Sequence, residues 1–177
     1  NTQMTIHAYN GTAALAFAQK RGFGQDNKSE YDFFDDVLDL SELFQQKVMD
    51  KFVSEYVHGH TPNPCIDCNR EIKFGALLDW ALEHGADAIA TGHYAQVAFD
   101  ETSGRWILLR GKDRRKDQSY VLYQLTQHQL AHLLLPVGDY EKPALRALAA
   151  QAGLTNADKA DSQDICFVPD GDYMSFL

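Results

Sequence analysis

The sequence predicts an α/β fold, in which helices pack against a small parallel sheet. Residues 42–56 and 70–84 each carry apolar side chains at the spacing of a helix packed on a core. The second of these helices is followed by a short apolar stretch, 86–90, that predicts a buried strand. Helix followed by buried strand is the repeating unit of an α/β sheet, and ligands bind beyond the carboxyl ends of its strands. We therefore expect Gly92 and His93 to lie at a binding site.

The first elements are predicted from local signals. Val37 and Leu38 end a short strand. Asp39, with Glu42 three residues later, resembles a capping box that opens the first helix. The apolar positions of that helix then extend to residue 56, where its core-facing pattern stops.

A stiff loop is predicted over residues 59–68. Pro62 and Pro64 each lack a backbone donor and push the preceding residue into an extended conformation. The loop would carry two thiols, Cys65 and Cys68, ahead of the second helix.

Five further elements are expected along the rest of the chain: a strand at 106–109, helices at 117–125, 127–135 and 143–153, and a polar loop at 161–167. That polar loop carries the third cysteine, Cys166.

Composition limits the function. The chain has 177 residues, 45% of them hydrophobic, which suits one domain or one domain and part of another. A net charge of −9 argues against nonspecific coating of nucleic acid, which needs concentrated Lys and Arg. One basic patch is compatible with local RNA contact or with a solvated loop: Arg105, Arg110, Lys112, Arg114, Arg115 and Lys116. Because no signal peptide or long apolar run is present, we expect a cytoplasmic protein without membrane contact.

The three cysteines have several possible roles. Their odd number does not suit a secreted disulfide framework. Cys65 and Cys68 form a C-x-x-C, which is typical of half a zinc site or of a redox pair. A zinc site would also need Cys166 and a histidine, and no second C-x-x-C is present. A redox pair would sit at a helix N-terminus, where the helix dipole lowers a thiol pKa.

Four sequence blocks then resemble the tRNA-specific 2-thiouridylases, the MnmA/TrmU family. Residues 60–74, HTPNPCIDCNREIKF, resemble the family's T-P-N-P-x-x-x-C-N-x-x-I-K-F block. The other blocks follow in the family's order: ATGHYA at 90–95, KDQSY at 116–120 leading to Leu122 and Tyr123, and Asp161-Ser162 with ICF at 165–167. The resemblance covers residues 36–177.

The resemblance implies a fold and an activity. Residues 1–125 would form part of an adenine-nucleotide hydrolase-like (PP-loop ATPase) domain, with residues 1–35 matching poorly. Residues 126–177 would be a helical segment with the persulfide-cysteine loop, where the tRNA-binding part begins. The implied activity is ATP-dependent 2-thiolation of the wobble uridine of tRNA, with Mg²⁺ beside ATP. A persulfide sulfur-relay protein or a cysteine desulfurase would supply the sulfur.

Roles follow residue by residue from the resemblance. Cys68 matches the family's nucleophile and Cys166 its persulfide carrier, while Gly92 matches a backbone contact to ATP. The remaining matches are tRNA contacts: Asn63, Pro64 and Cys65 at the target base, and His93, Lys116, Asp117 and Gln118 elsewhere. His93 could instead be a satisfied partner at a strand end, and Asp117 a simple helix cap.

The sequence departs from the family pattern in two places. Position 65 is often Asp in the family, whereas here Cys65 could join Cys68 and Cys166 in holding an iron–sulfur cluster with one open iron. The family's S-G-G-x-D-S phosphate loop is not found in this sequence, so we expect weak ATP binding. The departures predict a fragment, or a product degraded at its front, that carries the sulfur-transfer half of the site. The rivals are a catalytically inactive tRNA-binding fragment and an iron–sulfur or metal-binding module.

Overall fold

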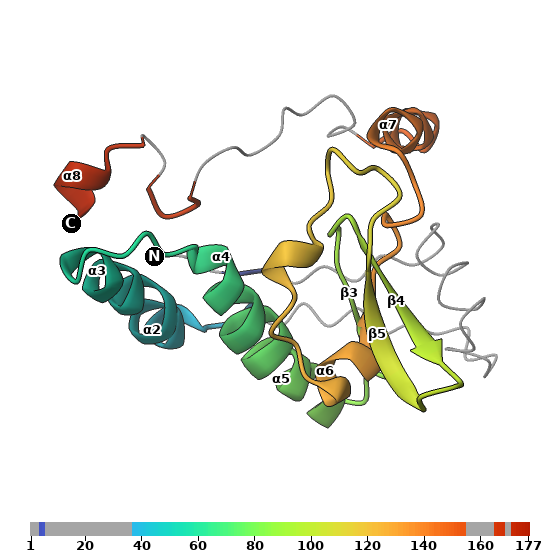
Figure 1. The fold of residues 1–177 in the computed structure, drawn as a ribbon, viewed down its shortest axis with the longest axis horizontal. Helices are drawn as coiled ribbons and strands as arrows, with labels where there is room; N and C mark the ends of the chain where they lie inside the picture. Colours follow the sequence, from blue (N-terminus) through green and yellow to red (C-terminus); the bar gives the residue numbers. More distant parts are fainter. Residues whose placement is uncertain (1–3, 6–36, 155–164, 169–170) are drawn as a thin grey trace.

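The computed structural model describes residues 4–5, 37–154, 165–168 and 171–177. Two long helical runs dominate it (Figure 1). The first consists of α2 (Ser41–Phe44), η1 (Gln45–Met49) and α3 (Asp50–Val57). The second consists of α4 (Pro64–Asp67), η2 (Cys68–Ala76) and α5 (Leu77–Glu83). Both η1 and η2 are π-helical, so their backbone turns are wider than those of an α-helix.

The two helical runs pack against each other through apolar side chains. Phe44 and Val48 of the first run and Ile72 of the second are buried together in one cluster. Apolar residues at the edge of the first run, such as Leu43, complete it. The helical pattern predicted for 42–56 is confirmed, because its apolar face is the one that packs on the second run.

The strands form three pairs. β3 (Ile89–Ala90) runs parallel to β6 (Leu133–Leu134). β4 (Ala95–Asp100) and β5 (Arg105–Arg110) form an antiparallel hairpin, and β1 (Met4–Thr5) pairs antiparallel with β2 (Val37–Leu38). The strands predicted at 37–38 and 106–109 are thus confirmed, as is the α/β class with its small parallel sheet. The buried strand predicted over 86–90 is confirmed only at 89–90, and it is not buried, since Ile89 is half-buried and Ala90 is exposed.

A second apolar core lies between the hairpin and the second helical run. Its buried residues are Phe74, Ala95, Val97, Val121, Leu122, Leu130, Leu133 and Leu135. The helix η2 contributes Phe74 to this core and Ile72 to the first one. The segment that carries Cys68 and Lys73 is therefore fixed from two sides.

The predicted loop over 59–68 is wrong at its end, because the second helical run begins at Pro64. The Asn63 side chain accepts a hydrogen bond from the Cys65 amide at 3.1 Å and so caps the helix. Proline is well suited to the first helical position, where its missing N–H has no partner to lose. Cys65 and Cys68 therefore lie on a helix and not in a loop.

The predicted Asp39–Glu42 capping box is also wrong. Helix α2 begins at Ser41, and Asp39 accepts hydrogen bonds from the Ser41 amide and hydroxyl. The Glu42 side chain accepts instead from Gln46, one turn further along the helix, at 3.1 Å. The reciprocal bond that defines a capping box is replaced by a local Asp39–Ser41 turn.

The helix predicted over 117–125 is replaced by a short 3₁₀ turn, η3 (Ser119–Val121). Asp117 uses its carboxylate to accept from the Gly111 amide at 2.8 Å and from the Ser119 hydroxyl at 2.9 Å. These bonds hold a turn in place of a helix start. The helix predicted over 127–135 ends early as α6 (Gln127–Ala131), because the apolar residues after it form β6.

The last described elements are α7 (Lys142–Gln151) and α8 (Tyr173–Phe176). Helix α7 confirms the prediction for 143–153, and Gly153 follows it with the positive φ of 70° that favours glycine after a helix.

Residues 1–3, 6–36, 155–164 and 169–170 lie outside the described residues, and so do Asp161 and Ser162 of the fourth block. The division proposed at residue 126 stays a prediction. Across the described residues, no helix is both long and apolar enough to cross a membrane.

Candidate functional site

Two thiols lie on the first turns of the second helical run. Cys65 is exposed, while Cys68 is partly buried against the Phe44 cluster. The helix start is held by two interactions, the Asn63 cap and an ion pair between Lys51 and Asp67 at 2.7 Å. The C-x-x-C therefore sits at a fixed helix N-terminus, the location expected of a redox pair and also of an activated nucleophile.

The third thiol is brought to the same place from the other end of the chain. Cys166 is exposed, but its neighbour Phe167 packs edge-on against Phe44 and Phe52, with ring centroids 5.8 and 5.4 Å apart. Phe167 also packs against the cluster that includes Cys68. Helix α8 adds Phe176, 5.3 Å from Phe167, and Figure 1 shows α8 beside α3. The aromatic contacts thus anchor the Cys166 loop against the helices.

The environment raises the pKa of both helical thiols. For Cys68 the main cause is burial, which disfavours the thiolate; the Lys73 ammonium opposes it, while the charges of Cys166 and Cys65 add to it. For Cys65 burial again dominates, with the same opposing effect of Lys73 and a smaller contribution from Cys166. The three thiols are close enough that the charge of one affects the ionisation of another.

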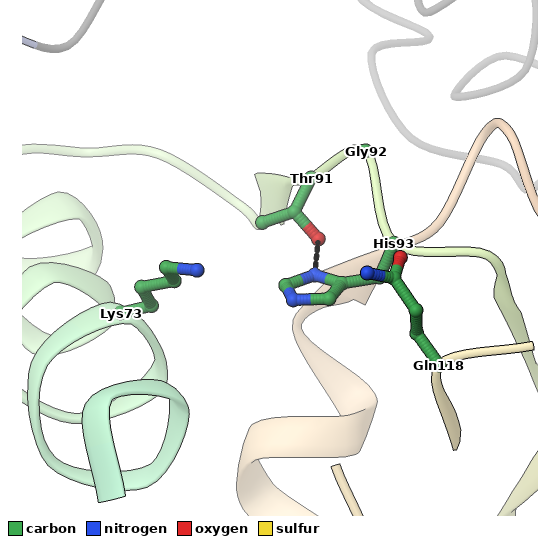
Figure 2. A pocket seen from close by; sticks show the side chains of 5 residues that line it. All are labelled: Lys73, Thr91, Gly92, His93 and Gln118. Atoms are coloured by element: carbon green, nitrogen blue, oxygen red, sulfur yellow. Dashed lines mark hydrogen bonds between the residues drawn. The ribbon is translucent and has the colours of Figure 1, made fainter. Parts of the chain in front are cut away.

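A hollow of about 300 Å³ lies beyond the end of β3. It is lined by Lys73, Thr91, Gly92, His93 and Gln118 (Figure 2). Lys73 reaches it from η2 and Gln118 from the turn before η3, so three separate segments meet there. The lining holds a cation and hydrogen-bond donors but no carboxylate, a composition that suits an anionic ligand such as a phosphate. This position agrees with the expectation that ligands bind beyond the carboxyl end of a strand.

His93 is a neutral histidine in this hollow. It is 9% exposed, and burial lowers its pKa to about 4, with the Lys73 charge acting in the same direction. Its Nδ1 atom lies 2.8 Å from the Thr91 hydroxyl, which fixes the ring (Figure 2). At neutral pH the ring therefore has Nε2 left to donate to or accept from a ligand, depending on the tautomer, and it carries no charge.

Gln118 and Asp117 organise the backbone beside the hollow. The Gln118 side-chain oxygen accepts from the Tyr94 amide at 3.0 Å, which leaves the amide nitrogen of Gln118 able to donate to a ligand. Asp117 holds the turn through Gly111 and Ser119. The structure thus brings Gly92, His93 and Gln118 together, whereas Asp117 does not line the hollow.

The remaining predicted contacts are spread along neighbouring segments. Asn63, Pro64 and Cys65 form the helix start, and Lys116 lies in the basic loop before Asp117. Lys73 and Thr91 were not predicted as site residues. Lys73 does lie within the block at 60–74, five residues after Cys68, and Thr91 precedes Gly92; their positions in known blocks are the only sequence signals for them.

Metal binding is not supported by the described geometry. Within residues 37–154, 165–168 and 171–177, no three side chains of the His, Cys, Asp and Glu types are grouped as metal ligands would be. This finding includes Cys65, Cys68 and Cys166, so the described arrangement of the three thiols does not support the iron–sulfur alternative.

Comparison with known proteins decides the family. The sequence model described as the tRNA methyl transferase HUP domain matches residues 32–170. The chain belongs to this family. The match spans both Cys68 and Cys166, and the HUP domain, a PP-loop ATPase-like fold, agrees with the helices and small parallel sheet observed here.

Curated relatives resemble this member of the HUP-domain family closely. The tRNA-specific 2-thiouridylase MnmA of Carboxydothermus hydrogenoformans is 57% identical over 141 residues, which are 80% of this chain and 39% of that protein. The MnmA of Moorella thermoacetica is 56% identical over 141 residues, covering 80% of this chain and 40% of that protein. That of Clostridioides difficile is 50% identical over 141 residues, with coverage of 80% and 39%. The chain spans about two fifths of the length of these relatives.

Proposed function

We propose that this chain carries the sulfur-transfer part of a tRNA 2-thiouridylase, with Cys68 and Cys166 as its two reactive thiols. The observation that supports this most is the anchoring of Phe167, which holds the Cys166 loop against the same apolar cluster that Cys68 packs on, 98 residues away in sequence. The names of the curated relatives supply the substrate, a tRNA, and the reaction, formation of 2-thiouridine.

Two neighbouring thiols fit sulfur transfer chemically. ATP would transfer its AMP group to the uridine carbonyl oxygen with release of pyrophosphate, because this oxygen is otherwise a poor leaving group. A persulfide on Cys166 would attack the activated carbon, and the phosphorylated oxygen would leave as part of AMP. The Cys68 thiolate would then attack Cys166 Sγ in the remaining sulfur–sulfur bond, which releases the outer sulfur to the base and joins Cys68 to Cys166. A reductant supplying two electrons would restore both thiols.

The hollow beyond the end of β3 fits the nucleotide and RNA contacts of this proposal. Gly92, His93 and Gln118 would meet the nucleotide and the tRNA there, with Mg²⁺ accompanying ATP. Asn63, Pro64 and Cys65 would face the target base, which must leave its stack to reach a thiol. Lys116 and Asp117 would contact the tRNA from the neighbouring turn. We place the protein in the cytoplasm, with a persulfide relay protein or cysteine desulfurase as its sulfur donor.

The family description names methyl transfer, whereas the relatives are named for thiolation. A methyl transfer does not require two thiols held near each other, so the cysteine arrangement favours thiolation. The second candidate from the sequence, an iron–sulfur cluster on Cys65, Cys68 and Cys166, has less support, because these three described thiols influence one another's ionisation but are not grouped as metal ligands would be.

Persulfide mapping tests the proposal. The purified chain is incubated with a cysteine desulfurase and cysteine, its free thiols are blocked, and its peptides are analysed by mass spectrometry. We expect the mass of one added sulfur on Cys166, which is lost in Cys166→Ser and kept in Cys65→Ser. Persulfide on Cys65 alone, or on none of the cysteines, would contradict the assignment. Anaerobic reconstitution with iron and sulfide separates the second candidate, since a cluster would give a broad visible absorbance.

A further inference from the structure

We propose that Lys73 is a positioning residue of the sulfur-transfer site and that its ammonium stabilises the anionic form of Cys68. The inference rests on the proposed function, because sulfur transfer requires Cys68 to react as a thiolate. Its test, by contrast, needs neither tRNA nor ATP. None of the sequence blocks assigned a role to Lys73.

The π-helical backbone of η2 places the two residues on one face. Cys68 and Lys73 both lie within Cys68–Ala76, five positions apart. In an α-helix, positions five apart point about 140° away from each other, because each residue turns the helix by about 100°. In a π-helix the hydrogen bonds join residues five apart, as between the Leu77 amide and the Ile72 carbonyl here. The wider turn therefore brings residue 73 above residue 68.

Gly75 allows the backbone to kink at the end of this wide turn, because its φ of −97° and ψ of −107° lie outside the helical range. A Cβ atom at position 75 would lie 2.9 Å from the carbonyl oxygen of Arg70, closer than real Cβ contacts. The close approach to the Arg70 carbonyl therefore belongs to the kink that follows the turn carrying Cys68 and Lys73. A glycine at this position is consistent with a backbone geometry that a side chain would disturb.

The charge of Lys73 is available to the thiols. Among the described residues, no carboxylate forms an ion pair with its ammonium. The side chain is partly buried, and Figure 2 shows it extending from its helix toward the hollow and the His93 ring. Solvent screens a partly buried cation less than an exposed one.

The surroundings of Cys68 leave Lys73 as the group that opposes burial. The neighbouring side chains from the first helical run are apolar, among them Leu40, Leu43 and Met49. Of the charged groups that act on Cys68, the other two are the thiols of Cys65 and Cys166, and both raise its pKa. Lys73 lowers it. Loss of the Cys68 proton to water is therefore easier with Lys73 than without it.

Thiol alkylation tests the inference directly. In a background of Cys65→Ser and Cys166→Ser, Cys68 is the single thiol, and its rate of reaction with the neutral reagent iodoacetamide is measured from pH 6 to 11. Because only the thiolate reacts, we expect Lys73→Met to move the midpoint to higher pH and to slow the reaction at pH 8 by about three- to tenfold. Lys73→Arg keeps the charge and should restore most of the rate.

Two controls separate this effect from a change in folding. Lys47→Met removes an exposed lysine of η1 and should leave the alkylation profile unchanged. Circular dichroism and urea unfolding report whether each variant is folded, and Lys73→Gln carries the test if Lys73→Met is not. Equal midpoints for folded Lys73→Gln, Lys73→Met and the parent protein would overturn the inference. Such a result would leave persulfide formation on Cys166 unaffected, so the two proposals can fail separately.

Discussion

At the scale of single residues, the site combines a buried neutral histidine with Lys73, whose ammonium forms no ion pair with any carboxylate that the structure describes. Burial and the Lys73 charge both keep His93 unprotonated, and Thr91 fixes its ring. A ligand in the hollow therefore meets one full positive charge, on Lys73, and polar groups around it. Because His93 is held neutral in the folded protein, the stability of the fold depends on pH.

His93 should destabilise the fold on acidification. Its pKa is about 4 when folded, well below its ordinary value near 6.5, so between these values the unfolded chain binds the extra proton. Stability is then full above about pH 6.5 and falls as the pH approaches 4, by up to about 3 kcal/mol from this residue. Urea unfolding at pH 4.5, 5.5 and 7 measures the slope, and His93→Asn should flatten it. An equal slope in the variant would show that other groups cause the acid sensitivity.

Asn63 should act as a helix cap independently of any contact with RNA. Its side chain accepts from the Cys65 amide, so Asn63→Ala should cost about 1 kcal/mol in the free energy of unfolding. Asn63→Asp keeps the acceptor and should retain the stability. Urea unfolding measures the stability of both variants. An equal loss of stability in Asn63→Asp and Asn63→Ala would argue against a capping role.

The chemistry-bearing residues were partly predictable from sequence. The cysteines and Gly92-His93 stand in recognisable blocks, and a buried strand before Gly92 predicted its place at a ligand site. Lys73 was not predicted, because ordinary helical spacing turns it away from Cys68. Only the π-helical backbone of η2 reverses that relation.

At the scale of elements, side-chain hydrogen bonds explain where the predicted boundaries were wrong. Pro64 was expected to exclude a helix, but with Asn63 as its cap it starts one. Asp117 was expected to open a helix. Its carboxylate instead accepts a hydrogen bond from the Gly111 amide, which precedes it in the chain and is not part of a helix. The spacing of apolar residues predicts which face of a helix is buried. It does not predict side-chain hydrogen bonds such as those of Asn63 and Asp117, which fix where a helix begins.

Gly75→Ala tests the π-helical element. In a regular helix this change stabilises by up to about 1 kcal/mol, but here the new Cβ would approach the Arg70 carbonyl at 2.9 Å. We expect a loss of about 1 to 3 kcal/mol in the free energy of unfolding. We also expect slower alkylation of Cys68, since Lys73 would be displaced. Gly92→Ala, whose Cβ meets nothing within 4 Å, is the matched control for stability. Stabilisation by Gly75→Ala would show that η2 tolerates a regular α-helical turn.

At the scale of the whole molecule, two apolar cores meet at the helix that carries Cys68. One core attaches this helix to the strands and the hollow, and the other attaches it to α2, η1 and the Cys166 loop. The aromatic ring of Phe167 is the contact that joins the C-terminal segment to this arrangement. Sequence periodicity could not predict that contact, because Phe167 lies in a short loop far along the chain from its partners.

Phe167→Ala should therefore separate the two reactive thiols. The loss of its three ring contacts frees the Cys166 loop while leaving the Cys68 helix in its own cores. We expect disulfide formation between Cys68 and Cys166 to slow several-fold under mild oxidation, whereas Phe167→Leu should slow it less. An unchanged rate in Phe167→Ala would show that other contacts position the loop.

The most direct test of the central claim is the disulfide that forms in the unmodified chain. Mild oxidation, alkylation of the remaining thiols and peptide mapping identify it. The proposal predicts a bond between Cys68 and Cys166. A disulfide requires Cα atoms within about 4.4 to 6.8 Å, so the bond forms only if the Cys166 loop can reach the helix that carries Cys68. Cys65, on the same helix as Cys68, should remain available for alkylation. A bond between Cys65 and Cys68 alone, with Cys166 fully alkylated, would contradict the proposal and favour a local redox pair.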